Sequence, residues 1–196
     1  MSEAVLIAPI ANPGAGKSLF AKHLSRNYGF DTFNAGLLFR QWVIGEFGVA
    51  EKRPATDIHA AFRQANGRTA ITDAVLQTNS ERLVYDSPRN IADFEKFKQY
   101  GGISVALWCP LDERSRRRTE DPGDPKYAPD IDSFHAEEKH EYSSPDPLGC
   151  HVLDIMQSAD YHLDAFCDKQ TFRHRIDELL EKVGIEAPSQ EFAEAV

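Results

Sequence analysis

A glycine-rich segment near the start of the chain has the residue types that bind phosphate. It reads Ala11-Asn12-Pro13-Gly14-Ala15-Gly16-Lys17-Ser18 and lies between an apolar run at 4–8 and a helix-like stretch at 19–24. In such a strand–loop–helix unit, backbone N–H groups and a helix N-terminus face one concavity that an anion fills. The lysine follows the β- and γ-phosphates, and the serine hydroxyl is a ligand of Mg²⁺. The segment predicts a site for ATP with Mg²⁺, formed by Asn12, Pro13, Gly14, Ala15, Gly16, Lys17, Ser18 and Leu19.

The elements that must position this loop follow an alternating pattern. Short apolar runs alternate with helical patterns, which is typical of an α/β fold with a mostly parallel sheet. The runs at 4–10, 30–33, 82–86, 103–109 and 161–164 are predicted as strands. The first strand should end near Pro9, because proline has no N–H to donate to a neighbouring strand.

Helical periodicity fills the gaps between these strands. Helices are predicted over 18–27, from a cap at Asn34 to about 47, from a cap at Thr56 to Gly67, after a cap at Asn90, and over 169–183. Residues from about 185 onward are small, acidic and proline-containing, which predicts a frayed tail.

Composition limits the possible partners and compartments. The chain has 196 residues, of which 41% are hydrophobic, so one domain with small inserts can pack a core. The net charge of −9 disfavours a nucleic-acid backbone as partner, although a local basic groove stays compatible with one. There is no apolar run near the ~20 residues of a membrane span and no secretory signal. Cys109, Cys150 and Cys167 lack metal-ligand spacing and are predicted to be thiols in a reducing cytoplasm.

A basic cluster follows the fourth predicted strand. Residues 111–118 contain Arg114, Arg116, Arg117 and Arg118, and turn-forming residues follow at 119–125. Helical spacing places Arg114 on one face with Arg117 and Arg118. The polar, acidic stretch 133–142 is predicted to be a solvated helix or an excursion outside the sheet.

Two further motifs, taken with the glycine-rich segment, resemble those of the nucleoside-monophosphate-kinase family of P-loop proteins. They are Phe33-Asn34-Ala35-Gly36-Leu37-Leu38-Phe39-Arg40 and Val84-Tyr85-Asp86-Ser87-Pro88-Arg89-Asn90. The second is more similar to smaller relatives described as resembling dephospho-CoA kinase. The resemblance covers about 4–183 in motif order. This chain departs from the pattern with Ala11 at the first glycine of the loop, Leu37 at a usual aspartate and Ser87-Pro88 in place of Gly-x.

The resemblance implies a three-layer P-loop kinase fold with a five-stranded, mostly parallel sheet. It implies one domain over 1–196, with a small acceptor-binding insert at about 36–80, a lid at about 114–147 and the frayed tail at about 185–196. A lid excludes water from the transferring phosphoryl group and brings cations to it.

The resemblance also implies roles for single residues. Gly36, Arg40 and Arg89 would bind the acceptor, because the planar fork of arginine binds phosphate oxygens in two places. Ser18 and Asp86 would hold the metal. The catalytic set would be Lys17, Asp86, Arg89, Arg114 and Arg118, with Arg117 as a substitute.

These observations lead to one main hypothesis and three alternatives. The main one is a kinase that moves the γ-phosphoryl group of ATP-Mg²⁺ to a nucleoside (deoxy)monophosphate, working as a monomer or homodimer. The alternatives are a hydroxyl kinase on the same fold, with Asp86 as base, a kinase acting on DNA, and a regulatory nucleotide-binding module without transfer. The acceptor's identity stays open, and Phe47, Arg53, Phe62, Arg63 and Arg68 are candidates to contact it.

Overall fold

Five strands form one parallel sheet in the computed structural model, which describes residues 4–47, 55–120 and 130–188. They are β1 (Val5–Ile10), β2 (Asp31–Phe33), β3 (Arg82–Tyr85), β4 (Ile103–Trp108) and β5 (Tyr161–Asp164), in the order β2-β3-β1-β4-β5. All five predicted strands are present, and the sheet is parallel throughout. Pro9 lies one residue before the end of β1.

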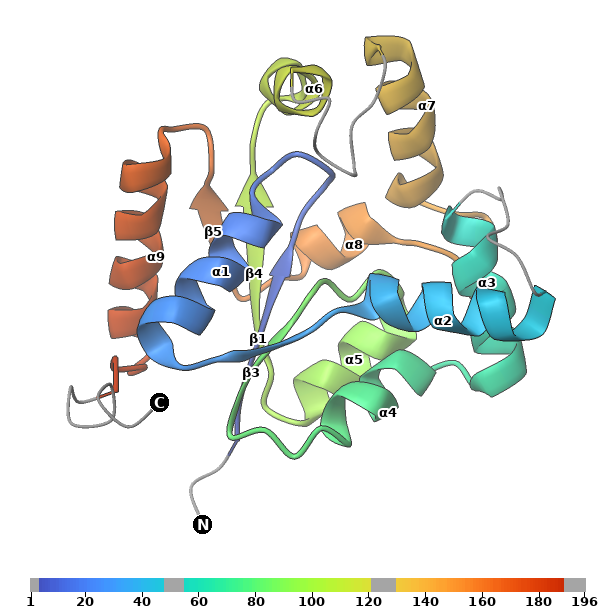
Figure 1. The fold of residues 1–196 in the computed structure, drawn as a ribbon, viewed down its shortest axis with the longest axis horizontal. Coiled ribbons are helices and arrows are strands. Elements are labelled where there is room, and N and C mark those ends of the chain that lie inside the picture. Colours follow the sequence, from blue (N-terminus) through green and yellow to red (C-terminus); the bar gives the residue numbers. More distant parts are fainter. Residues whose placement is uncertain (1–3, 48–54, 121–129, 189–196) are drawn as a thin grey trace.

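The helices cover both faces of this sheet (Figure 1). Helices α1 and α9 lie on one face, α2 to α5 and α8 lie on the other, and α6 and α7 lie at the carboxyl end of the strands. Their bounds are α1 Lys17–Tyr28, α2 Ala35–Phe47, α3 Ala55–Asn66, α4 Ala70–Leu76, α5 Ile91–Gln99, α6 Leu111–Thr119, α7 Ile131–Tyr142, α8 Val152–Gln157 and α9 Lys169–Lys182.

The central strand β1 contributes side chains to a core on each face. Ile7 packs with α1 and α9, whereas Leu6 and Ile10 pack with the helices of the opposite face. A strand buried on both faces reads as a continuous apolar run, which is why its sequence pattern was clear. Because β1 pairs with β3 and β4, the loops after these three strands meet at one edge of the sheet.

Local signals located several helix starts. Asn34 Oδ1 accepts a hydrogen bond from the Leu37 N–H, and Asn90 Oδ1 accepts one from the Ala92 N–H, so both predicted caps are confirmed. The predicted cap at Thr56 is wrong, because α3 already begins at Ala55. Helices α4 and α8, of 7 and 6 residues, were not predicted, since so few residues show little periodicity.

Two other expectations are corrected by burial. The tail predicted from about 185 is packed at its start, because Ile185 is 7% exposed in the α1–α9 core and the Glu186 carbonyl accepts a hydrogen bond from Arg82. Residues 189–196 lie outside the described part. Helix α7 lies outside the sheet, as one of the two alternatives for 133–142 had it, but it is only partly solvated, because Phe134 and Glu138 are 1% and 2% exposed. Of the predicted loop at 119–125, residues 121–125 lie outside the described ranges.

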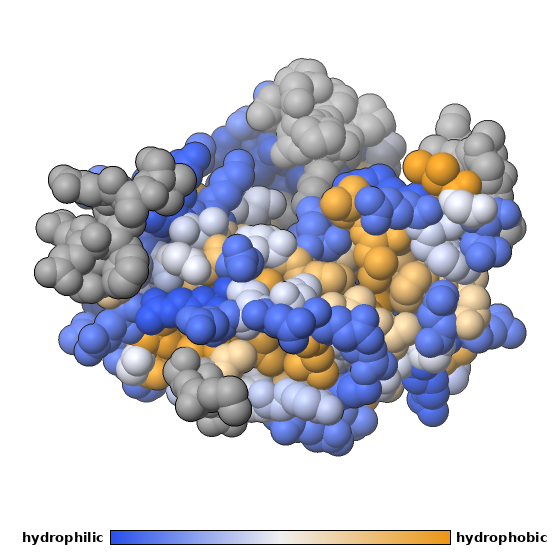
Figure 2. Space-filling model, turned by 60° about the horizontal axis from the view of Figure 1, so that its bottom comes forward, coloured by the Kyte–Doolittle hydropathy of each residue, from blue (hydrophilic) through white to orange (hydrophobic). Residues whose placement is uncertain are grey.

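The surface is mainly hydrophilic, with hydrophobic residues between the polar ones on the face shown in Figure 2. The large exposed hydrophobic residues come from several elements: Leu37, Ile44, Ile91, Tyr100, Trp108, Ile131, Leu153 and Phe166. No helix in the described ranges is long and apolar enough to cross a membrane. The three cysteines form no disulfide.

Candidate active site

The Ala11–Ser18 loop follows β1 and opens α1, and its two glycines have backbone angles that L-residues avoid. Gly14 has φ +79° and Gly16 has φ +107°. A Cβ at Gly14 would lie 2.8 Å from the Arg114 carbonyl oxygen, and one at Gly16 would lie 3.2 Å from Phe172 Cε1. The loop is therefore held between α6 and α9 in a conformation that needs glycine at both positions.

Lys17 and Ser18 begin α1 at the end of this loop. Lys17 is 9% exposed, and its Nζ donates to the carbonyl oxygens of Ala11 at 2.7 Å and Asn12 at 3.3 Å. The ammonium group thus lies over the loop where phosphate oxygens are expected. Ser18 is exposed in the first helical turn, so its hydroxyl is accessible to a ligand.

The second half of the site comes from the segment after β3. The Asp86 N–H donates to the Phe33 carbonyl, and the Ser87 N–H donates to the Tyr85 carbonyl at 2.7 Å. Ser87 has φ +66°, which is unusual for a residue other than glycine. The family that this chain resembles has glycine at this position, where a positive φ causes no strain. Strained backbone is common at functional sites.

One cavity of about 710 Å³ joins the two halves. Lys17 lines it together with two of the predicted acceptor-binding arginines, Arg40 and Arg89, and with Asp86. The full lining is Lys17, Asn34, Ala35, Gly36, Phe39, Arg40, Ile58, His59, Arg63, Ile71, Tyr85, Asp86, Ser87, Arg89 and Glu141. Its four Lys and Arg side chains outnumber its two carboxylates, in a chain whose net charge is −9.

Arg40 and Gly36 lie on α2 at the mouth of the cavity. Arg40 is exposed, and a Cβ at Gly36 would lie 3.8 Å from Arg40 Nη1 and 3.2 Å from Asn34 Oδ1. Glycine at this position leaves room between the two polar side chains.

Arg89 forms an ion pair with Glu141 of α7, a residue that the sequence did not single out. Burial acts to lower the pKa of Arg89, but Glu141, Cys150 and Asp86 together outweigh it and raise the pKa above its ordinary value. Oxygen Oε2 of Glu141 is buried and has no hydrogen-bond partner among the described residues. Helix α7 therefore contributes a carboxylate to the same cavity as the acceptor arginines.

The α6 arginines do not all face the loop. Arg114 is 4% exposed; it donates to the Pro13 carbonyl at 3.2 Å and pairs with Glu138 of α7. Arg117 donates to the Gly14 carbonyl at 3.4 Å. Arg118 is 9% exposed, and its Nε has no hydrogen-bond partner in the described part of the chain.

Arg117, the expected substitute for Arg118, thus donates a hydrogen bond to the glycine loop. Among the described residues, no hydrogen bond joins Arg118 to this loop. Arg116 points to solvent and pairs with Glu113 and Glu120.

The residues predicted from the sequence to contact the acceptor differ in their burial. Phe62 is a core residue, in edge contact with Phe39 and Trp42. Arg63 is buried and lines the cavity, whereas Arg68 is exposed outside its lining. Arg53 and the side chain of Phe47 lie outside the described parts.

A second cavity of about 580 Å³ borders Ser18 on the α1–α9 side of the molecule. Its lining is Ser18, Leu19, Lys22, His23, Arg26, Asn27, Lys169 and Arg173. Four of these side chains are cationic, so an anionic ligand that begins at Ser18 would find positive charge further along α1.

Ser18 and Asp86 supply oxygen donors, which are the ligands that Mg²⁺ prefers. They follow the neighbouring strands β1 and β3, at the same edge of the sheet. Within the described residues there is no group of three or more His, Cys, Asp or Glu that would hold a metal by itself. The donor set fits a cation whose other ligands come from nucleotide phosphates and water.

Solved structures share the fold of this chain at low sequence identity. A shikimate kinase from Acinetobacter baumannii in complex with shikimate is 18% identical, with TM-score 0.56 over 92% of this chain and 94% of its own. TT1252 from Thermus thermophilus is 15% identical, with TM-score 0.61 over 92% and 98%. A deoxyadenosine kinase from M. mycoides is 13% identical, with TM-score 0.54 over 92% and 99%. No protein-family model and no curated protein matches the chain. The chain has the fold of the small P-loop kinases.

Proposed function

We propose that this chain is an ATP-dependent kinase that transfers the γ-phosphoryl group to a nucleoside monophosphate or deoxymonophosphate. The observation that carries the proposal is the shared cavity, in which Lys17 of the glycine loop faces the same space as Arg40 and Arg89. A donor phosphate on the loop and an acceptor phosphate on the arginines would then meet within one enclosed site.

Transfer needs positioning and charge neutralisation more than acid–base chemistry. A phosphate oxygen of the acceptor attacks the γ-phosphorus, and the bond from phosphorus to the β–γ bridging oxygen breaks, which leaves ADP. Lys17 stabilises the negative charge that develops on the β- and γ-oxygens, and Arg89 holds the attacking phosphate. Ser18 and Asp86 would hold Mg²⁺, which neutralises phosphate charge when bound.

The excess of cations in the cavity supports a phosphorylated acceptor. Arg40 is exposed and lines the cavity, so it is available to a ligand phosphate. Arg89 would exchange the Glu141 carboxylate for phosphate oxygens, which offer more acceptor sites to a planar guanidinium.

A hydroxyl kinase is the second candidate, and the Asp86 carboxylate favours it. This carboxylate lines the cavity and accepts no hydrogen bond from any described residue, so it could take the proton of an alcohol acceptor. Shikimate and deoxyadenosine, after which two of the similar structures are named, carry hydroxyl groups and no phosphate.

The test is ADP release with ATP-Mg²⁺ and a panel of acceptors: NMPs, dNMPs, dephospho-CoA and nucleosides. Stimulation by monophosphates supports the proposal, and stimulation by dephospho-CoA or nucleosides alone supports the hydroxyl kinase. If none of them stimulates ADP release, a regulatory nucleotide-binding module without phosphoryl transfer becomes the better hypothesis.

Matched arginine variants sharpen this test. Arg89→Ala should lower transfer by about 10²–10³-fold, as when one donor to a transition-state oxyanion is removed, with ATP binding retained. Arg116→Ala, which removes an exposed arginine outside the site, should leave the rate unchanged. Equal losses in both variants would count against the assignment of Arg89.

A further inference from the structure

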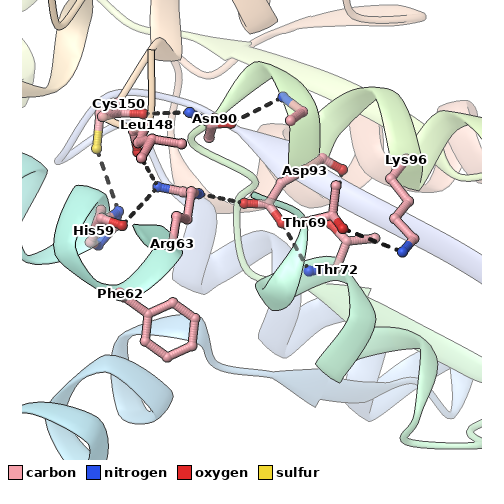
Figure 3. A network of polar contacts seen from close by, with 12 residues as sticks. His59, Phe62, Arg63, Thr69, Thr72, Asn90, Asp93, Lys96, Leu148 and Cys150 are labelled. Carbon is pink, nitrogen blue, oxygen red and sulfur yellow. Dashed lines mark hydrogen bonds and ion pairs between the residues drawn. The ribbon is translucent and has the colours of Figure 1, made fainter. Parts of the chain in front are cut away.

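Arg63 is a fully buried cation at the inner wall of the acceptor cavity. It comes from α3, is 1% exposed, and lines the cavity with Ile58, Ile71 and Tyr85. Figure 3 shows its guanidinium between Asp93 on one side and the His59 and Leu148 carbonyls on the other. An arginine so deeply buried needs partners for all of its N–H groups.

Three of the five N–H groups have partners in the protein. Nε donates to Asp93 Oδ2 at 2.8 Å, and Nη1 donates to the Leu148 carbonyl at 3.0 Å and the His59 carbonyl at 3.4 Å. Nη2 is buried and has no hydrogen-bond partner among the described residues. An unsatisfied buried donor is costly, so the two N–H groups of Nη2 indicate an acceptor atom supplied by a ligand.

The charge of this ligand atom follows from Asp93. Both side chains of the Arg63–Asp93 pair have 0% exposure, so the pair is electrically neutral before any ligand binds. A second carboxylate or phosphate at Nη2 would be a buried, uncompensated negative charge. The pair favours a neutral acceptor, such as the carbonyl oxygen of a heterocycle.

The surrounding wall suits a flat, uncharged ring. Phe39 stacks on His59 with ring centroids 3.8 Å apart, and Ile58 and Ile71 complete an apolar surface. Burial, with Arg89 and Arg63 nearby, lowers the pKa of His59 well below 6.5, so this wall carries no charge at neutral pH. The hydroxyl of Tyr85 is buried close to Thr72.

We propose that Arg63 Nη2 reads a ring carbonyl oxygen of the acceptor's base, so that oxo-base nucleotides are preferred over adenine nucleotides. Adenine has ring nitrogens but no carbonyl, whereas uracil, thymine, cytosine, guanine and hypoxanthine all have one. This inference rests on the proposed function, because it takes the acceptor to be a nucleotide with its phosphate at Arg40 and Arg89.

The test measures binding and transfer separately, with dTMP, dUMP, dCMP, dGMP, dIMP and dAMP. A hydrogen bond to a charged group contributes about 1.5–3 kcal/mol, so the best oxo-base nucleotide should bind about 10- to 100-fold more tightly than dAMP. The pair dIMP and dAMP has the same purine shape and differs in the 6-oxo or 6-amino group and in N1, which carries a hydrogen only in hypoxanthine.

Three variants test the role of Arg63. The double variant Arg63→Met, Asp93→Leu removes the buried pair without leaving a charge, and Tyr85→Phe removes only a hydroxyl. The double variant should lose the preference for oxo bases, whereas Tyr85→Phe, which keeps Arg63 and Asp93, should retain it. Lys96→Met removes a charge that pairs with Asp73 in the same network, away from the cavity, and should leave the preference unchanged.

The outcomes separate the two proposals. Oxo-base preference in binding without transfer would overturn the kinase proposal and retain base recognition by Arg63. Transfer to all six nucleotides with equal affinity would overturn base recognition and retain the kinase. If dAMP binds as tightly as the best oxo-base nucleotide, or if the double variant keeps the preference, the role of Arg63 is refuted.

Discussion

The ion pair between Arg114 and Glu138 predicts a large loss of stability when the carboxylate is removed. The two side chains have exposures of 5% and 3%, and they join α6, which contacts the glycine loop, to α7. Glu138→Gln would leave the Arg114 charge buried without its partner. Such a change costs about 3–5 kcal/mol in buried pairs.

The structure favours the lower end of this range. Arg114 would keep its hydrogen bonds to the Cys109 carbonyl at 3.0 Å and the Pro13 carbonyl at 3.2 Å. A loss of about 3 kcal/mol in a chain of this length lowers Tm by about 6–12 °C, at about 2–4 °C per kcal/mol. Thermal unfolding followed by circular dichroism measures this shift directly.

A matched control lies at the C-terminal end of α6. Glu120 pairs with Arg116, but both side chains are more than half exposed, so solvent and salt screen the pair. Glu120→Gln makes the same chemical change and should shift Tm by no more than the error of measurement. If Glu138→Gln and Glu120→Gln shift Tm equally, the argument from burial is wrong.

Ligand binding adds a second arm to this experiment. If phosphate oxygens can take the place of the Glu138 carboxylate at Arg114, ATP-Mg²⁺ should raise the Tm of Glu138→Gln at least as much as that of the parent chain. A smaller rise in the variant would mean that Glu138 supports the nucleotide site rather than competing with nucleotide for Arg114.

Three further predictions follow from single residues. Ser87→Gly should stabilise the chain by about 0.5–1 kcal/mol, because relief of the strained φ of +66° exceeds the added backbone entropy; a lower Tm would instead assign a structural role to the hydroxyl. Burial and a hydrogen bond to Asp177 raise the pKa of Tyr28 to about 12. The neutral phenol therefore stabilises the fold fully below pH 10, and this contribution is lost as the pH rises through 12. An ultraviolet titration should show a late phase that Tyr28→Phe removes, and an unchanged curve would contradict the assignment. Because the pKa of His59 is lowered well below 6.5, the neutral ring stabilises the fold above pH 6.5 and this contribution is lost as the pH falls; the His59 NMR signal should not titrate between pH 8 and 6. A normal titration would show that the ring reaches solvent.

The parts of the fold with strong local signals were predictable from sequence. The apolar run of β1 and the asparagine caps at Asn34 and Asn90 depend on neighbouring residues alone, so their positions were found within one or two residues. The short helices α4 and α8 carry too few residues for a period to be seen. Ile185 seemed part of a tail because its burial comes from α1 and α9, which local composition does not show.

Some residues of the candidate site could be predicted from the sequence, and others could not. The glycine loop, Arg40, Asp86 and Arg89 were predicted from motif order, and Lys17, Arg40, Asp86 and Arg89 line one cavity. Glu138 and Glu141 were missed, although they lie three residues apart on one polar helix, because nothing in the sequence indicates which arginines they meet.

By itself, the sequence determined the strand pattern, the glycine loop and the residue types for phosphate chemistry, because periodicity and short motifs are local properties. Only the tertiary structure decided how charges pair: Arg114 with Glu138, Arg89 with Glu141, and Arg63 with Asp93. Such pairs depend on how helices far apart in the chain pack together. Burial then makes each of them energetically important, since a charge removed from water must find its partner inside the fold.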